Sequence, residues 1–359
     1  MNRQWSKEEI WNWYHARPWV VGCNYVSAIT LHNIEMFQED LFETVFQVAE
    51  KEMELMESLG INSVRMFLPF AIWYHDRDKF LDRLDFYLTA FAKHGISMMP
   101  VIFNDCVGFA GRPDKIEPAK HTGWMKYEIG HHGGKKNDNP FIGDKFRKGW
   151  ILWDEEEWQE VLLDYLRALL KRFGNDERIL IWDLWNEPGN SNRGDTSIPY
   201  IQRTFEEARK LNPIQPLTAG CWSYPQDFGV NPDAKLNPVE KLAVELSDII
   251  TFHQYEKIDR VKAVIKGLEA YGRPMMNTEW LNRILDNFFE ENIELYKSKN
   301  IGSYHWGLVA GKSQHFLPWD ELRSNKELDL TRWQHDLFDT YHTPYDPAEI
   351  AALKRATGK

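Results

Sequence analysis

Two glutamates stand directly after apolar runs of the sequence and are the strongest candidates for chemistry. Residues 182–185 lead into Asn186-Glu187-Pro188, and residues 274–278 lead into Glu279. Proline cannot donate to a sheet and disfavours a helical residue before it, so the first run must end at Glu187. A single glutamate of this kind is usually a solvated strand-end residue. Two carboxylates facing each other can instead act as an acid and a nucleophile.

Short apolar runs alternate with longer amphipathic stretches along nearly the whole chain, which indicates βα repetition. Apolar residues spaced by three and four predict helices over 46–58 and 80–93 that end at Gly60 and Gly95, where glycine can adopt the left-handed cap. Eight strands are predicted over residues 19–23, 63–67, 97–103, 179–185, 217–219, 248–252, 274–278 and 302–306. The sequence therefore predicts an α/β fold, a (β/α)8 TIM barrel with its site at the carboxyl ends of the strands.

One connection of this predicted barrel is far longer than the others. Residues 104–153, rich in Gly, Pro, His and Lys, follow strand three on the face where barrel active sites lie. No internal repeat, low-complexity tract or Ser/Gly linker marks a second domain. Residues 1–359 are expected to form one barrel domain, with N- and C-terminal extensions packed on it and a last helix that begins after Pro344.

Composition narrows the classes of partner. The 43 Lys and Arg residues against 54 Asp and Glu residues give a formal charge of −11, which argues against nucleic acid and against anionic membranes. Three widely separated cysteines indicate neither a disulfide scaffold nor a cysteine zinc site. The sequence given has no signal-peptide pattern and no long apolar run, so a cytoplasmic location is expected. Homo-oligomerisation is left open.

At this point the residues carry a family resemblance. Asn186-Glu187-Pro188 on the fourth predicted strand, with Glu279 ending the seventh, resembles the clan of retaining (β/α)8 glycosidases that includes glycoside hydrolase family 5. The resemblance runs from Trp19 to Trp306 in strand order. It implies that Glu187 is the general acid/base and Glu279 the nucleophile, which forms a covalent glycosyl-enzyme, with no metal or other cofactor.

The same resemblance assigns expected roles to residues on neighbouring strands. Arg65 would lie near the nucleophile and favour its ionised form, while Asn186 would hydrogen-bond the sugar 2-hydroxyl. Among the substrate-binding candidates, Tyr255 would orient and stabilise Glu279, and His253 would either bind substrate or hold Glu187. Trp306 would form an aromatic platform under the sugar. For His253 and Trp306, structural and packing roles are the competing interpretations.

The chain departs from the family after strand three, where a histidine is common and this sequence reads Phe103-Asn104-Asp105-Cys106. Asn104 and Asp105 are candidate contacts to sugar hydroxyls, as is Glu35 after strand one. For Asp105 and Glu35, an ordinary loop carboxylate is an equally good interpretation.

The sequence is compatible with three functional hypotheses. The first is a retaining hydrolase of β-linked oligosaccharides, exo-acting on short substrates such as β-mannosides, with an endo-acting glucanase, mannanase or xylanase as its variant. The second is a sugar-binding barrel without catalysis. The third is a metal-dependent hydrolase, which the spacing of His121, His131 and His132 does not support.

Overall fold

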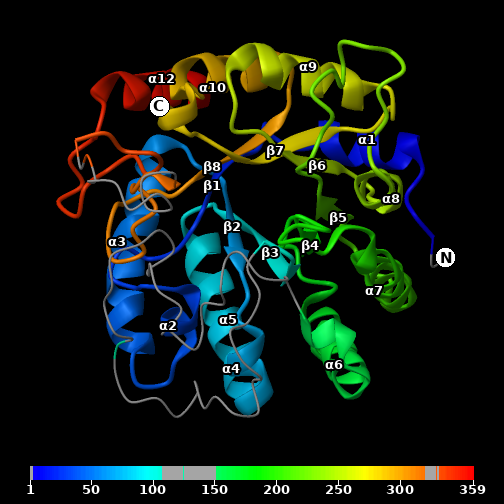
Figure 1. The fold of residues 1–359 in the computed structure, drawn as a ribbon. Coiled ribbons are helices and arrows are strands. Elements are labelled where there is room, and N and C mark those ends of the chain that lie inside the picture. The colour runs from blue at the N-terminus through cyan, green and yellow to red at the C-terminus, as the bar shows by residue number, and fades with distance from the viewer. Residues whose placement is uncertain (1–2, 107–123, 125–150, 320–328, 330) are drawn as a thin grey trace.

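Eight parallel strands form a single sheet that curls into a barrel with helices around it (Figure 1). The structure is a computed structural model, and it describes residues 3–106, 124, 151–319, 329 and 331–359. Much of the predicted long connection over 104–153, including His121, His131 and His132, lies outside the described residues. The strands are β1 (Val21–Asn24), β2 (Ser63–Phe67), β3 (Ser97–Asn104), β4 (Trp182–Asn186), β5 (Leu217–Gly220), β6 (Ile250–His253), β7 (Met275–Trp280) and β8 (Gly302–Trp306).

The strand order confirms the predicted (β/α)8 barrel. Neighbours run β5-β4-β3-β2-β1-β8-β7-β6, so that β1 pairs with both β2 and β8. The seam between β5 and β6 is bridged just after β5, where the Cys221 N–H donates to the Thr251 carbonyl at 3.0 Å and the His253 N–H donates to the Cys221 carbonyl at 2.8 Å. The carboxyl ends of all eight strands therefore meet around one mouth.

Helices follow the strands and cover the outside of the barrel. They are α1 (Lys7–His15), α2 (Asn33–Phe37), α3 (Phe42–Leu59), α4 (Phe70–His75), α5 (Arg77–Lys93), α6 (Glu156–Phe173), α7 (Ile198–Leu211), α8 (Pro238–Leu246), α9 (Ile258–Glu269), α10 (Phe289–Ser298) and α12 (Pro347–Thr357), with short 3-10 turns η4 (Ile151–Asp154), η5 (Gly194–Ser197) and η6 (Arg283–Leu285). Helix α3 buries apolar side chains at helical spacing and ends at Gly60, whose φ of 75° is left-handed as predicted.

The two ends of the barrel differ in polarity. Under the amino ends of the strands, Ile10 and Tyr14 of α1 pack on a buried apolar cluster that includes Met99, Ile181 and Tyr304. The Tyr14 hydroxyl also accepts a hydrogen bond from the Gly302 N–H at 2.9 Å. Because this end is filled by apolar side chains, the polar groups that need partners or substrate gather at the opposite, carboxyl end.

Strand boundaries shift from their predicted positions by up to three residues. The apolar run from Ile179 predicts a strand from its first residue, but β4 begins at Trp182, and Ile179 forms only an isolated bridge with Met98. Residues 179 and 181 are nevertheless buried. Burial produces the apolar pattern whether or not the backbone is paired, so the pattern alone cannot fix the boundary.

None of the helices in the described part of the chain combines the length and the apolar character that crossing a bilayer requires.

Close packing inside the barrel leads to the first prediction. A Cβ atom on Gly22 of β1 would lie 2.4 Å from the Ser63 carbonyl oxygen and 2.6 Å from the Tyr304 ring. Gly22→Ala should therefore lower the free energy of unfolding by about 3 kcal/mol or more, because neither the sheet nor the ring can move freely. The measurement is chemical or calorimetric unfolding.

The matched control is Gly95→Ala. A Cβ atom there meets nothing within 4 Å, and only the left-handed φ of 70° opposes it. Its cost should be about 1–2 kcal/mol. Equal losses in the two variants would contradict the packing argument.

Candidate active site

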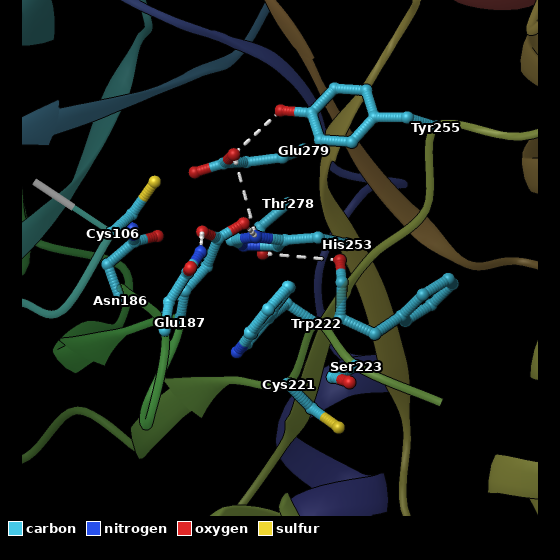
Figure 2. Close-up of polar contacts among 12 residues, drawn as sticks. Cys106, Asn186, Glu187, Cys221, Trp222, Ser223, His253, Tyr255, Thr278 and Glu279 are labelled. Atoms are coloured by element: carbon cyan, nitrogen blue, oxygen red, sulfur yellow. Dashed lines mark hydrogen bonds and ion pairs between the residues drawn. The ribbon is translucent and has the colours of Figure 1, made fainter. Parts of the chain in front are cut away.

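Glu187 and Glu279 come together at the mouth of the barrel, one directly after β4 and the other near the end of β7. Both are buried. A carboxylate oxygen of Glu187, a carboxylate oxygen of Glu279 and a ring nitrogen of His253 all lie within 4.8 Å of one another. Figure 2 shows His253 between the two glutamates. The structure therefore brings three residues that the sequence singled out into one site.

The local backbone explains why Glu187 projects from its strand. Strand β4 ends at Asn186, Pro188 removes the next donor, and Glu187 itself adopts a left-handed φ of 47°. The prediction that proline keeps Glu187 out of helical geometry is confirmed, but the left-handed conformation is uncommon for glutamate and was not anticipated. Such strained conformations persist where surrounding contacts hold them, which is the case here.

Arg65 of β2 lies fully buried at the centre of the site. Its Nη1 donates to Glu279 Oε1 and to Asn24 Oδ1, both at 2.7 Å. Its Nη2 donates to Asn186 Oδ1 at 2.6 Å and lies 2.8 Å from Asp183 Oδ2, to which Nε also donates at 2.9 Å. A guanidinium has five N–H donors; four of them form hydrogen bonds here, and Nη2 also lies within ion-pair distance of Asp183.

The second oxygen of Glu279 is held from the other side. Its Oε2 accepts hydrogen bonds from the Tyr255 hydroxyl at 2.7 Å and from Trp306 Nε1 at 2.9 Å. Burial by itself raises the pKa of this carboxyl, but interactions with His253 and Arg65 and the two hydrogen bonds outweigh burial. The pKa of Glu279 is therefore held below the usual range of glutamate, which favours the ionised form.

Glu187 has different neighbours. His253 Nδ1 lies 2.8 Å from Glu187 Oε1 and 3.5 Å from Glu279 Oε2, and the Asn190 amide donates to Glu187 Oε2 at 2.6 Å. Gly220 makes room for the imidazole, because a Cβ atom there would lie 2.9 Å from His253 Nε2. The two glutamates thus share His253 but differ in every other described hydrogen-bond partner.

Asn186 and Asn104 form one hydrogen-bonded unit across β3 and β4. Asn186 Nδ2 donates to Asn104 Oδ1 at 2.8 Å, while Asn186 Oδ1 accepts from Arg65. Asn104 Oδ1 also accepts from the Cys106 N–H at 2.8 Å. Asn104, a candidate contact to sugar hydroxyls, therefore also orients the Asn186 amide.

The carboxylates of Asp105 and Glu35, also candidate substrate contacts, are buried and bonded within the protein. Asp105 accepts from the Gly189 N–H at 2.9 Å and pairs with Arg193 at 3.1 Å. Glu35 accepts from the Leu31 N–H at 2.7 Å. Both carboxylates thus bind groups of the protein itself, and Glu35 lies in helix α2 and not in a loop.

Four residues of the site escaped the sequence analysis: Asn24, Asp183, Asn190 and Trp222. Asp183 was detectable, because a charged residue inside an apolar strand needs a buried partner, here Arg65. Trp222 donates from Nε1 to the Pro188 carbonyl at 3.1 Å and stands beside Glu187 (Figure 2). Its position depends on the loop after β5, which no periodic pattern predicts.

The cluster of Glu187, His253 and Glu279 also has the composition of a metal site. Arg65 already supplies a positive charge 2.7 Å from Glu279 Oε1, in the position where a cation would compensate that carboxylate. A pair of carboxyl groups can cleave a glycosidic bond without a metal, so Glu187 and Glu279 can perform that chemistry with the groups already present.

This fold, with two carboxylates at its mouth, belongs to the class of (β/α)8 glycoside hydrolases. Residues 42–304 match the family model Cellulase (glycosyl hydrolase family 5). The match covers most of the chain, so the chain belongs to glycosyl hydrolase family 5 and is an O-glycosyl hydrolase. Two-step hydrolysis with retention is general to that family. Membership sets aside the non-catalytic sugar-binding barrel.

Among curated proteins, the chain is similar to mannan endo-1,4-beta-mannosidase F of Aspergillus clavatus, with 26% identity over 143 residues. That alignment covers 39% of this chain and 26% of the relative, so the chain matches only about a quarter of the relative's length.

Solved structures of the same fold include an exo-beta-1,4-mannosidase from Opitutaceae bacterium strain TAV5 and an endo-1,4-beta-mannanase from Rhizomucor miehei. The first aligns with a TM-score of 0.59 and 17% identity over 95% of this chain and 59% of that chain. The second aligns with a TM-score of 0.57 and 13% identity over 94% of this chain and 95% of that chain. At these identities the likeness supports the fold.

The contacts of Glu279 lead to a pH prediction. A retaining glycosidase needs one ionised carboxylate, and the pKa of Glu279 is lowered here in part by the Tyr255 hydroxyl. Tyr255→Phe removes that donor, so the pKa of Glu279 should rise and the acidic limb of the kcat/KM profile should move to higher pH. The exposed Tyr341→Phe is the control and should leave the profile unchanged. An acidic limb that stays in place in Tyr255→Phe would contradict this account of the pKa.

Proposed function

We propose that this family 5 enzyme uses Glu187 as general acid/base and Glu279 as nucleophile. The observation that carries the proposal is that one carboxylate oxygen of Glu187 and one of Glu279 lie within 4.8 Å of each other. Retaining glycosidases hold their carboxyl groups about 5–5.5 Å apart, whereas inverting enzymes separate them by about 6.5–9.5 Å to admit a water molecule. The short separation supports direct attack by a carboxylate on the anomeric carbon.

The surroundings of the two carboxyl groups support this division of roles. Glu279 receives the guanidinium of Arg65 and two further donors, which stabilise the negative charge needed for attack. Glu187 has no arginine among its described hydrogen-bond partners, and His253 and Asn190 bind it instead. Different environments for two carboxyl groups allow one to act as an acid while the other is ionised.

Three neighbours would bind the sugar at the cleavage point. Asn186 has two amide hydrogens and uses one for Asn104, so the other can serve a sugar hydroxyl. Trp306 holds Glu279 through Nε1 and stacks on Phe67 with ring centres 6.0 Å apart, which forms an aromatic floor beside the nucleophile. Such a floor suits the apolar face of a sugar ring.

We further propose that the substrates are short β-linked oligosaccharides, with β-mannosides first, and that the enzyme acts from a chain end. The named relatives act on mannan or β-mannosides, which sets the order of testing. Lys312, after β8, lies 4.1 Å from the ring centre of Trp124 in the segment after β3. We infer from this contact that Trp124 and Lys312 restrict access to the mouth of the barrel, which would favour action at a chain end. An endo-acting mannanase is the alternative.

Hydrolysis of a substrate panel tests the function. The panel holds nitrophenyl β-mannoside, β-glucoside, β-galactoside and β-xyloside, mannobiose, and polymeric mannan, glucan and xylan. We expect release from nitrophenyl β-mannoside and mannobiose. Glu187→Ala and Glu279→Ala should each lower turnover of mannobiose by at least about 100-fold, since a positioned acid alone contributes 10²–10⁴. Glu187→Ala should unfold as the parent does. Glu279→Ala leaves the buried Arg65 without one carboxylate partner and should lower the free energy of unfolding, so its turnover is compared per folded molecule.

The outcomes separate the parts of the proposal. Activity on polymer alone would overturn exo action, and a preference for another glycoside would overturn the choice of mannose. Undiminished activity in either glutamate variant would overturn the assignment of the catalytic pair. Activity that persists with a chelator is expected, because no step requires a metal.

A further inference from the structure

Asn190 contacts the proposed acid/base in a way that the general chemistry of a carboxylate pair does not require. It lies three residues after Glu187, in the turn between β4 and η5, and its N–H donates to the Glu187 carbonyl at 3.1 Å. Its side-chain Nδ2 donates to Glu187 Oε2 at 2.6 Å. The side chain of this turn therefore reaches back to the carboxyl group that begins the turn.

The direction of the Asn190 amide is fixed by a second bond. Its Oδ1 accepts from the Ser191 N–H at 2.6 Å. Reversing the amide would place two oxygens together at Glu187 and two donors together at Ser191, so Nδ2 must face the carboxyl group. This bond removes the usual ambiguity of an amide side chain.

The turn that carries Asn190 is itself anchored to β3. The Ser191 hydroxyl donates to the Cys106 carbonyl at 2.6 Å, and the Gly189 N–H donates to Asp105 Oδ2 at 2.9 Å. Asp105 in turn pairs with the buried Arg193. The amide is thus presented to Glu187 by a rigid support, which is the condition for holding a reacting group in place.

The amide donor of Asn190 on Glu187 Oε2 affects which oxygen of Glu187 carries the acidic proton. Because Oε2 accepts the hydrogen bond from Asn190 and the carbonyl oxygen of a carboxylic acid is the better acceptor, this contact favours the protonated form of Glu187 that carries its proton on Oε1. Oε1 lies on the side of His253, whose Nδ1 is 2.8 Å from Oε1 and 3.5 Å from Glu279 Oε2. The transferable proton is therefore on the oxygen turned toward the centre of the site.

We propose that Asn190 is a positioning residue for acid catalysis, which holds Glu187 Oε2 as an acceptor and directs the acidic proton to Oε1. This inference rests on the proposed role of Glu187. It predicts that the loss of kcat/KM in Asn190 variants grows with the need of the leaving group for a proton.

The test compares two aryl glycosides of the sugar identified by the panel, with β-mannose expected. A 2,4-dinitrophenyl group leaves without protonation, whereas a phenyl group needs an acid. Asn190→Asp keeps the oxygen that accepts from Ser191 but turns a second oxygen toward Glu187, so the two carboxyl groups would hold a proton between them. We expect kcat/KM to fall about 100-fold for the phenyl glycoside and less than about threefold for the dinitrophenyl glycoside.

Two further variants make the result interpretable. Ser191→Ala removes the bond to Cys106 and loosens the same turn without touching Glu187, so it should change both substrates equally. Asn190→Ala should show the same selective loss as Asn190→Asp. The ratio of the two rates is independent of how much of each sample is folded, so partial unfolding does not obscure it.

Glu187→Ala, measured in parallel, separates the acid/base role of Glu187 from the positioning role of Asn190. If Glu187→Ala shows the leaving-group dependence while the Asn190 variants lower both rates equally or neither, Asn190 is only a structural residue of the turn and the inference is wrong. If Glu187→Ala itself shows no such dependence, the acid/base assignment fails and the inference fails with it.

Discussion

The whole site depends on one buried guanidinium. Arg65 comes from β2, and its guanidinium binds partners on β1, β4 and β7 through four hydrogen bonds and an ion pair with Asp183. These bonds fix the nucleophile candidate Glu279, the sugar-binding candidate Asn186 and the strand β4 that carries Glu187. A buried charge of this kind is stable only when every donor is satisfied, so the geometry of the mouth and the stability of the barrel centre are linked.

Two buried carboxylates, Asp183 and Glu279, pair with this arginine, and their other neighbours give them different pKa values. Burial raises the pKa of Asp183, and Arg65 only partly offsets that rise. Glu279 has the same burial and the same arginine, but it also has Tyr255, Trp306 and His253, and its pKa is lowered. The additional interactions therefore lower the pKa of Glu279, whereas burial raises that of Asp183.

Sequence reasoning succeeded where side chains are placed by periodic structure. Glu187 and Glu279 were predictable together because the ends of parallel strands meet at one mouth of a barrel, and the family resemblance placed Arg65 beside them. Asn190 was not, because its contact arises from a left-handed residue in a non-repeating turn, and Asp105 was ambiguous because its partner Arg193 lies far away in the sequence.

The central claim is that Glu279, held by Arg65, attacks the anomeric carbon directly. The most direct measurement is proton NMR of the sugar released from an aryl β-glycoside during the first minutes of hydrolysis, before the product equilibrates. Attack by a carboxylate followed by attack by water inverts the carbon twice, so the account predicts that the β-anomer appears first. Initial release of the α-anomer would mean a single displacement by water and would contradict the account.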